Sequence, residues 1–218
     1  MTRLGILGGT FNPAHVGHVR LALEMAEALA LDRVELIPAA RPPHKADTGM
    51  LPFDLRAKLL SLAVSGNPAL SVNLMEAKRP GPSFTWDTLV EIARGTPEAD
   101  IHFIMGACDL LNLHLWRRGP ELCKLANLAV ATRDQLGPAE VDDYIAAHPE
   151  MGCQPAGPGR WRASSGKFIE VVPIPRLDIS ASFIRERFRR GSNLRFLIPP
   201  GVEEELGRLK DQVLALWS

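Results

Sequence analysis

Two histidines, His15 and His18, lie three positions apart just after a pair of glycines. The stretch from Gly8 to His18 follows an apolar run, Leu4–Leu7, and precedes an amphipathic segment. This order predicts a buried strand that ends in a glycine turn, with both imidazoles on one face at the mouth of the next helix. Adjacent glycines let a ligand approach backbone N–H groups, and a helix N-terminus favours phosphate. The stretch therefore predicts chemistry on a nucleotide.

Other glycine turns require residues that this stretch lacks. A P-loop places Lys-Ser or Lys-Thr after its glycines, and a dinucleotide-binding turn spaces its glycines as G-x-G-x-x-G. Neither pattern fits Gly8, Gly9 and Gly17. A zinc site needs further ligands at suitable spacing, so we expect no resident metal at the two histidines. The remaining alternative is a structural strand–turn–helix in which the histidines only cap or pack.

The composition limits the classes of protein and partner. A chain of 218 residues with 46% hydrophobic residues fits a single globular domain, 1–218. Lysine plus arginine and aspartate plus glutamate both total 25, so the net charge favours neither nucleic acid nor a membrane surface. The three cysteines form no C-x-x-C pair, and no apolar run approaches the roughly 18 residues of a membrane span. We therefore expect a cytoplasmic protein with neither nucleic acid nor membrane as partner.

Short apolar runs alternate with helical patterns along the chain. The expected strands are Leu4–Leu7, Val34–Pro38, Leu70–Leu74, Ile101–Met105, Leu128–Thr132 and Phe168–Val172. The expected helices are Val19–Leu31, Leu55–Ser65, Thr85–Ala93, Glu121–Leu125, Phe183–Arg190 and Val202–Leu216. This alternation predicts an α/β fold, a Rossmann-like, doubly wound, mainly parallel sheet with helices on both faces. Such sheets bind ligands beyond the carboxyl ends of their strands, where the glycine turn lies.

Two segments fall outside this regular pattern. Residues 135–165 are rich in Gly, Pro and Ala, so we expect a variable surface excursion with one helical turn near Val141–Ala147. Residues 180–218 are expected to form a helical C-terminal end.

Two basic side chains follow predicted strands at the ligand end. Lys45 lies in a loop stiffened by Pro42 and Pro43, and Arg133 comes directly after the strand Leu128–Thr132. A lysine neutralises a phosphate as a point charge, and a planar guanidinium suits phosphate geometry. The structural alternatives are a solvated loop lysine and a salt bridge.

Two later helices begin with further candidate ligand-binding residues. Ser180 and Ser182 lie at the start of a helix whose first turn carries Arg185, which predicts an anion pocket. Ser83 or Thr85 is a candidate cap for the helix Thr85–Ala93. Trp116 suits either stacking on a heterocycle or packing in the core.

The order of these pieces resembles that of the bacterial nicotinate-nucleotide adenylyltransferases, within the H-x-G-H superfamily of nucleotidyltransferases. The matching motifs are G-G-T-F-N-P-A-H-V-G-H, P-P-H-K, S-F-T-W-D-T-L, G-A-C with a later tryptophan, and I-S-A-S-F-I-R. The resemblance covers Leu4 to Leu197. It implies transfer of AMP from ATP to nicotinate mononucleotide with Mg²⁺ as cofactor, by direct in-line attack and without a covalent enzyme intermediate.

The resemblance also implies a role for each matched residue. His15 and His18 would contact the ATP phosphates and stabilise the transition state. The residues implied in ATP binding are Gly8, Gly9, Thr10, Phe11, His15, His18, Lys45, Ser180, Ser182 and Arg185. The residues implied in nicotinate mononucleotide binding are Thr85, Trp116 and Arg133, with Trp116 stacked on the pyridine ring.

Four positions depart from the family pattern. Asn12 replaces an aspartate, Phe84 a tyrosine and Ser182 a threonine. Cys108 stands where the family usually has an aspartate that holds a ribose. The adjacent Asp109 is shifted by one residue, so its side chain points in another direction. The ribose contact implied at Cys108 or Asp109 is therefore the weakest part of the assignment.

Three other functions compete with this one. A related transferase would use nicotinamide mononucleotide or phosphopantetheine as acceptor, and the motifs at Thr85, Trp116 and Ser180–Arg185 argue against phosphopantetheine. A nucleotide-binding protein without turnover would fit Cys108 but not the intact histidine pair. The zero net charge disfavours a nucleic-acid-binding module. The sequence leaves the oligomeric state open.

Overall fold

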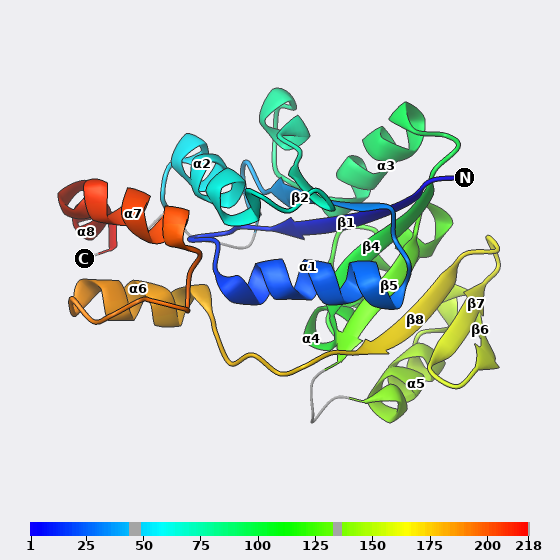
Figure 1. Ribbon diagram of the computed structural model, residues 1–218. Coiled ribbons are helices and arrows are strands. Elements are labelled where there is room, and N and C mark those ends of the chain that lie inside the picture. The colour runs from blue at the N-terminus through cyan, green and yellow to red at the C-terminus, as the bar shows by residue number, and fades with distance from the viewer. Residues whose placement is uncertain (44–48, 133–136, 218) are drawn as a thin grey trace. The chain divides into compact units, whose positions relative to one another are not determined.

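The computed structural model describes residues 1–43, 49–132 and 137–217 (Figure 1). The chain divides into two compact units. Unit 1 contains Met1–Leu7, Glu24–Val34 and Phe84–Arg176, and unit 2 contains Gly8–Leu23, Glu35–Ser83 and Leu177–Ser218. The first strand, first helix and second strand each contribute residues to both units. The organisation as a single domain over 1–218 stays a prediction.

The strands form a mainly parallel sheet. Their bounds are β1 Arg3–Gly9, β2 Arg33–Pro38, β3 Leu70–Val72, β4 Asp100–Gly106, β5 Asn127–Thr132, β6 Cys153–Gly157, β7 Arg160–Ala163 and β8 Phe168–Pro173. Within the described residues they form one eight-stranded sheet in the order β3-β2-β1-β4-β5-β8-β7-β6. The pairs β1–β4, β4–β5 and β5–β8 are parallel, whereas β8–β7 and β7–β6 are antiparallel. The predicted mainly parallel α/β fold is confirmed.

Burial explains why the central strands appear in the sequence as apolar runs. All six residues of β5 are buried, and so are the five inner residues of β4. A parallel strand that is covered on both faces needs apolar residues at successive positions rather than at every second one. The predicted strands Ile101–Met105 and Leu128–Thr132 lie entirely within the observed ones.

Unit 1 contains both α-helices and 3₁₀ helices. They are α3 Thr85–Gly95, α4 Ala107–Leu110 and α5 Pro138–Ala147, with the 3₁₀ helices η2 Leu113–Leu115, η3 Gly119–Lys124 and η4 Pro149–Met151. Helix α3 is amphipathic, and it buries Leu89 and Ile92 in the core of the unit. The predicted short helix at Glu121–Leu125 is the 3₁₀ helix η3.

Residues 137–165 are more regular than the sequence suggested. Where one helical turn was expected, α5 buries Val141, Tyr144 and Ile145 at helical spacing. Two unexpected strands, β6 and β7, extend the sheet beyond β8. Strand β7 alternates exposed and buried positions, and Trp161 and Ala163 face inward. Two inward residues are too few to form a recognisable apolar set in the sequence, so this strand was not predicted.

Unit 2 contains the remaining helices. They are α2 Phe53–Val64, the 3₁₀ helix η1 Met75–Lys78, α6 Ala181–Arg189, α7 Pro200–Arg208 and α8 Lys210–Trp217, while α1 Val16–Ala28 begins in unit 2 and ends in unit 1. The predicted single helix Val202–Leu216 is wrong, because the chain leaves helical geometry at Leu209. The break lets Val202 and Leu206 of α7 be buried together with Val213 and Trp217 of α8. None of the described helices is both long and apolar enough to span a membrane.

Candidate active site

The turn after β1 is built around a buried phenylalanine. Phe11 is 2% exposed and adopts a left-handed backbone conformation with φ of 49°. A Cβ atom on Gly9 would lie only 3.0 Å from the Phe11 ring, so the second glycine makes room for that ring. The ring also meets His18 edge-on, with 4.9 Å between the ring centroids. Phe11 thus fixes the turn and supports His18.

The two histidines lie side by side at the start of α1. Their ring centroids are 3.7 Å apart and their planes are tilted by 30°, as the three-residue spacing predicted. A Cβ atom on Gly17 would come within 3.0 Å of His15 Nδ1, so the intervening glycine gives the His15 ring its place. The helix begins at Val16, three residues earlier than expected.

A hydrogen bond to the backbone determines which nitrogen of His18 carries the proton. The backbone N–H of His15 donates to His18 Nδ1 at 3.2 Å. Because Nδ1 accepts this bond, the proton of a neutral ring lies on Nε2. The ring therefore caps the start of its own helix and directs a donor from Nε2.

Two guanidinium groups hold the backbone oxygens of the turn. Arg56, 1% exposed on α2, donates from Nη1 to the oxygen of Thr10 at 2.8 Å and from Nε to that of Leu51 at 3.0 Å. Arg185 on α6 donates from Nη1 to the oxygen of Asn12 at 2.8 Å and from Nη2 to Ser182 Oγ at 3.0 Å. Burial lowers the pKa of both groups. An arginine starts from so high a value that both remain charged at neutral pH.

Arg56 contacts the turn but was not predicted from the sequence. An arginine within the expected helix Leu55–Ser65 is typical of a solvent-exposed helix face. Its partners are backbone oxygens, which every residue has, so the sequence gives no sign of these hydrogen bonds. The clue was its position between Leu55 and Ala57, close to the buried positions of α2. The guanidinium places a positive charge directly behind the turn.

Asn12 connects the turn to the segment before α2. Its side-chain Nδ2 donates to the oxygen of Gly49 at 2.8 Å, and its Oδ1 accepts from the N–H of Leu51 at 3.0 Å. Both functions of an amide are therefore used, one as donor and one as acceptor. The aspartate common in the family would lack the donor, so asparagine here has a specific structural role.

Ser180 and Ser182 have different hydrogen-bond partners at the start of α6. Ser180 Oγ accepts a hydrogen bond from the N–H of Phe183 at 3.1 Å and caps the helix. Ser182 instead contacts Arg185. The oxygen of Ile179 would lie 3.6 Å from a Cβ on Gly17, so the segment before α6 reaches the start of α1. Unit 2 thus gathers the turn, both histidines, Ser182 and Arg185.

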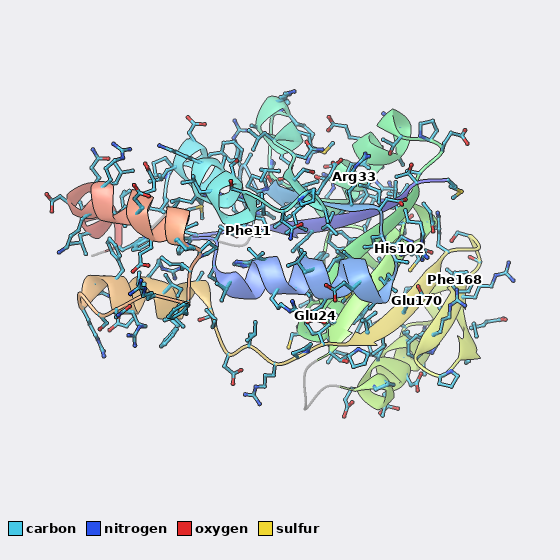
Figure 2. All side chains as sticks on the ribbon, viewed as in Figure 1. Phe11, Glu24, Arg33, His102, Phe168 and Glu170 are labelled. Carbon is cyan, nitrogen blue, oxygen red and sulfur yellow. The ribbon has the colours of Figure 1, made fainter. Side chains whose placement is uncertain are left out.

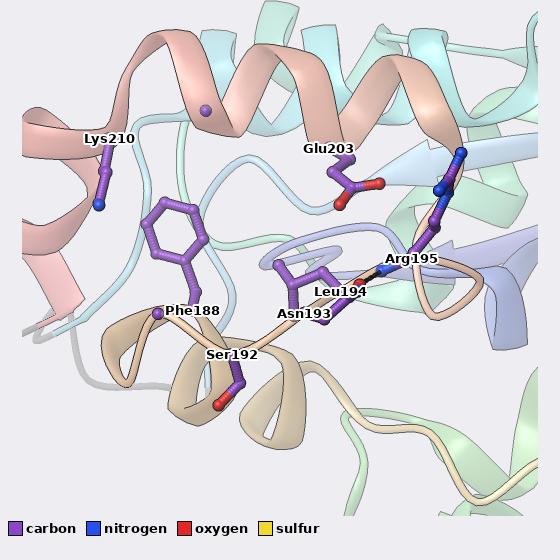
Figure 3. A pocket seen from close by; sticks show the side chains of 9 residues that line it. Phe188, Ser192, Asn193, Leu194, Arg195, Glu203 and Lys210 are labelled. Carbon is purple, nitrogen blue, oxygen red and sulfur yellow. Dashed lines mark hydrogen bonds between the residues drawn. The ribbon is translucent and has the colours of Figure 1, made fainter.

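A hollow of about 650 Å³ in unit 2 lies apart from this group (Figure 3). Phe188 of α6, Asn193 and Leu194 of the following connection, and Glu203 and Lys210 contribute to its wall. None of the described residues predicted to bind nucleotide lines it. Arg187 holds the connection in place with two hydrogen bonds to the oxygen of Asn193, at 3.0 and 2.7 Å. This hollow therefore belongs to the packing of the C-terminal helices.

Unit 1 contains the residues expected to hold the acceptor. Thr85 is the first residue of α3, and the N-cap position is Phe84, so neither of the predicted caps, Ser83 or Thr85, caps the helix with its side chain. Ser83 Oγ accepts a hydrogen bond from the N–H of Arg41 at 3.0 Å. The half-buried Trp116 meets Phe103 edge-on, with centroids 6.4 Å apart. Arg117 stacks over Phe84 with its Cζ 4.7 Å from the ring centroid. Lys45 and Arg133 lie outside the described residues.

Cys108 and Asp109 occupy the first turn of α4, directly after β4. Cys108 is an exposed, free cysteine. Asp109 Oδ2 accepts a hydrogen bond from the backbone N–H of Gly106 at 3.3 Å and so caps the short helix. The Asp109 carboxylate is therefore engaged with the backbone of its own helical turn.

Residues 6–187 match the family model described as cytidylyltransferase-like. That match, the mainly parallel sheet and the glycine–histidine turn define a nucleotidyltransferase.

Curated relatives and solved structures narrow the class. A "Probable nicotinate-nucleotide adenylyltransferase" of Trichlorobacter lovleyi is 42% identical over 205 residues, which are 92% of this chain and 94% of the relative. One of Geobacter sulfurreducens is 39% identical over the same shares of the two chains. The nicotinic acid mononucleotide adenylyltransferase of Plasmodium falciparum complexed with NaAD shares the fold, with a TM-score of 0.73 and 14% identity over 99% of this chain and 98% of that one. The chain belongs to the nicotinate-nucleotide adenylyltransferase family.

Proposed function

We propose that this chain transfers the adenylyl group of ATP to nicotinate mononucleotide, giving nicotinate adenine dinucleotide and pyrophosphate. The observation that carries the proposal is the pair of His15 and His18 at the end of a turn whose Asn12 oxygen is held by Arg185. Family membership supplies the acceptor, because the relatives are named for nicotinate nucleotide and a structural neighbour was solved with NaAD.

The chemistry needs no enzyme nucleophile. An oxygen of the mononucleotide phosphate attacks the α-phosphorus of ATP, and the new O–P bond forms as the bond to the bridging oxygen breaks. The electron pair of the broken bond leaves with pyrophosphate. Because the attacking phosphate is already an anion, no proton has to be removed from it. The enzyme therefore works by holding the two substrates in line and by stabilising negative charge.

His18 is the best-placed donor for this charge. With Nδ1 occupied by the His15 N–H, Nε2 carries the proton and donates to a phosphate oxygen. His15 packs against it and shares the site. The backbone of Gly8, Gly9, Thr10 and Phe11 contributes further donors to ATP.

Arg185 and Ser182 bind the triphosphate from α6, next to the N-terminus that Ser180 caps. Lys45 is proposed to add a point charge there. The side chains that unit 2 brings to the turn are imidazoles, hydroxyls and guanidiniums, which suit phosphate oxygens better than a cation. Mg²⁺ is therefore proposed to arrive with ATP, held by phosphate oxygens and water, and to neutralise charge on the triphosphate.

Unit 1 is proposed to bind the acceptor. Thr85 offers a hydroxyl and backbone N–H at the start of α3, Trp116 stacks on the pyridine ring, and Arg133 holds the phosphate or carboxylate. Cys108 contributes less to a ribose than an aspartate would. A cytoplasmic location and the absence of nucleic-acid and membrane partners remain predictions.

Pyrophosphate release tests the assignment. The enzyme is supplied with ATP, Mg²⁺ and one of nicotinate mononucleotide, nicotinamide mononucleotide or phosphopantetheine. We expect the highest kcat/KM with nicotinate mononucleotide. Faster turnover of either other acceptor, or no release with any, contradicts the proposal.

Two substitutions of His18 separate catalysis from capping. His18→Ala should lower kcat by about 100- to 1,000-fold, the usual effect of losing one preorganised donor. His18→Asn keeps an oxygen that accepts from the His15 N–H but loses the Nε2 donor. Compared with His18→Ala, it should therefore have a higher free energy of unfolding but the same low kcat. His148→Ala, a histidine of unit 1 paired with Glu150, serves as the control. If His18→Asn had the kcat of the wild type, the hydrogen bond that His18 accepts from the His15 N–H would be its whole role, and Nε2 would not be a catalytic donor.

A further inference from the structure

Two consecutive arginines follow Trp116, and each stacks on an aromatic ring at the start of α3. The Cζ atom of Arg117 lies 4.7 Å from the centroid of the Phe84 ring. The Cζ atom of Arg118 lies 3.7 Å from the centroid of the six-membered or five-membered ring system of Trp86. A guanidinium packs flat on an aromatic face and is attracted by the negative charge of that face. Two such contacts in a row hold the segment after Trp116 against one end of a helix.

Each guanidinium also binds a carboxylate. Arg117 Nη1 donates to Asp87 Oδ2 at 2.9 Å. Arg118 donates from Nε and Nη2 to the two oxygens of Glu121, both at 2.8 Å. The second arrangement is the bidentate one, which fixes the plane of a guanidinium as well as its position. The carboxylates therefore keep the two guanidinium groups in place over the rings.

The partners on α3 all lie in its first turn. Phe84 is the N-cap residue, and Trp86 and Asp87 are the second and third residues of the helix. The first residue of the helix, between these partners, is Thr85, which is proposed to contact the acceptor nicotinate mononucleotide. The two arginines thus contact α3 on both sides of Thr85.

The loop that carries Trp116 is closed by its own backbone. The N–H of Trp116 donates to the oxygen of Leu113 at 3.0 Å, and the N–H of Gly119 donates to the oxygen of Trp116 at 2.9 Å. A Cβ atom on Gly119 would overlap the oxygen of Leu113, so only glycine lets the loop close in this way. Arg118 adopts a left-handed backbone conformation with φ of 55°. Such a conformation persists only where surrounding contacts determine it, and the stacking and bidentate contacts of this side chain do so.

We propose that Arg117 and Arg118 are positioning residues for the acceptor, an inference that rests on the proposed function. They fix the Trp116 indole relative to Thr85, so that one acceptor molecule reaches both. Neither guanidinium has to touch the acceptor, because each is already engaged by a ring and a carboxylate. A site that is held ready before the acceptor arrives binds it more tightly than one that must be ordered on binding. Loss of either arginine should therefore weaken binding of the acceptor and leave binding of ATP unchanged.

Steady-state kinetics with each substrate varied in turn test the proposal. Arg117→Met and Arg118→Met should each raise the KM for nicotinate mononucleotide by about 3- to 10-fold, the effect of one lost arginine–aromatic contact. The KM for ATP and kcat should stay within about twofold of the wild type. Arg117→Lys keeps the charge but not the flat guanidinium, so its KM should lie between those of the wild type and Arg117→Met. The two arginine side chains are 51% and 46% exposed, so the variants should fold.

A chemically matched arginine lies at the other end of the sheet in unit 1. The Cζ atom of Arg160 lies 3.8 Å from the centroid of the Phe168 ring, and its Nε lies 2.9 Å from Glu170 Oε1. Figure 2 shows both partners on β8. Phe168 begins β8 at its amino end, whereas Trp116 follows the carboxyl end of β4, and both strands run parallel to β5. Arg160→Met removes the same kinds of contact and should leave the KM for the acceptor unchanged.

Asp87→Asn separates positioning from direct attraction of the acceptor by charge. The substitution weakens the hold on Arg117 and leaves its positive charge without a carboxylate. If Arg117 positions the site, the KM for nicotinate mononucleotide should rise. If its charge attracts the anionic acceptor instead, the KM should fall, and the positioning role is wrong.

NMR relaxation of the Trp116 backbone N–H distinguishes this inference from the proposed function. The order parameter should be about 0.85 in the wild type and in Arg160→Met, and below about 0.6 in the double variant Arg117→Met with Arg118→Met. If the wild type does not turn over nicotinate mononucleotide, the proposed function fails, and this order parameter alone decides the positioning role. An unchanged order parameter in the double variant, a wild-type KM in both single variants, or an equal rise in KM in Arg160→Met overturns the proposal.

Discussion

Arg185 donates a hydrogen bond of 2.8 Å from Nη1 to the backbone oxygen of Asn12, which lies 173 positions earlier in the chain. The bond brings the motif I-S-A-S-F-I-R, which leads into α6, to the glycine–histidine turn. The same guanidinium donates from Nη2 to Ser182 Oγ, so its plane is fixed by two contacts. Together with Arg56 on the oxygen of Thr10, it places two positive charges against a turn of the type that binds phosphate.

Arg185→Lys should lower kcat/KM by about 10- to 100-fold, although the charge is kept. A lysine offers a point charge, and it cannot hold Asn12 and Ser182 at once with the geometry of a guanidinium. Steady-state kinetics with ATP varied measures the effect, and the rise in KM for ATP should be the larger part. Arg189→Lys on the exposed side of α6, paired with Glu186, is the control and should change kcat/KM less than twofold. Equal kinetics of the two variants would remove Arg185 from the site.

Gly17→Ala should abolish most activity with little change in stability. The new methyl group would lie 3.0 Å from Nδ1 and 3.1 Å from Cε1 of His15, so the ring must move. Displacement of a positioned group by about 1 Å can cost about 100-fold in rate. Gly207→Ala on α7 is the matched control, because its methyl group meets nothing within 4 Å, and it should stabilise the protein by about 0.5–1 kcal/mol. Wild-type kcat in Gly17→Ala would show that His15 has room to adjust.

The sequence was sufficient to predict features that follow from a regular apolar pattern or from the spacing of nearby residues. Strands such as β5 appear as apolar runs because both of their faces are buried, and the two histidines share a face because of their spacing alone. The missed features depend on backbone partners. Arg56 binds the oxygens of Thr10 and Leu51, which every residue type possesses. Strand β7 was missed because only Trp161 and Ala163 face the core.

Cys108→Asp should lower the KM for the nucleotide whose ribose reaches α4 by about 3- to 10-fold, since a carboxylate accepts hydrogen bonds from ribose hydroxyls that a thiol does not. The position is exposed and lies in the first turn of a helix, where a negative charge is favourable, so the fold should not suffer. KM values for ATP and nicotinate mononucleotide, measured separately, identify the nucleotide. Cys108→Ala should leave both values within about twofold. If the aspartate variant behaves like the alanine variant, the ribose is held elsewhere.

Glu205→Gln should reduce stability at neutral pH and lose that effect in acid. Lys58 of α2 and Arg208 of α7 both bind the Glu205 carboxylate, at 3.0 and 2.6 Å. The hydrogen bonds from Arg208 and Lys58 lower its pKa from 4.5 to about 2. A lowered pKa in the folded state means that the stabilisation is complete above the unfolded value and is lost as the pH falls through the folded value. Urea unfolding of both proteins should therefore give free energies of unfolding that differ at pH 7 and converge between pH 4.5 and about 2. Glu204→Gln, at the exposed neighbouring position, is the control and should show no such convergence. If the difference in free energy of unfolding between wild type and Glu205→Gln did not depend on pH, packing rather than charge would hold α7 to α2.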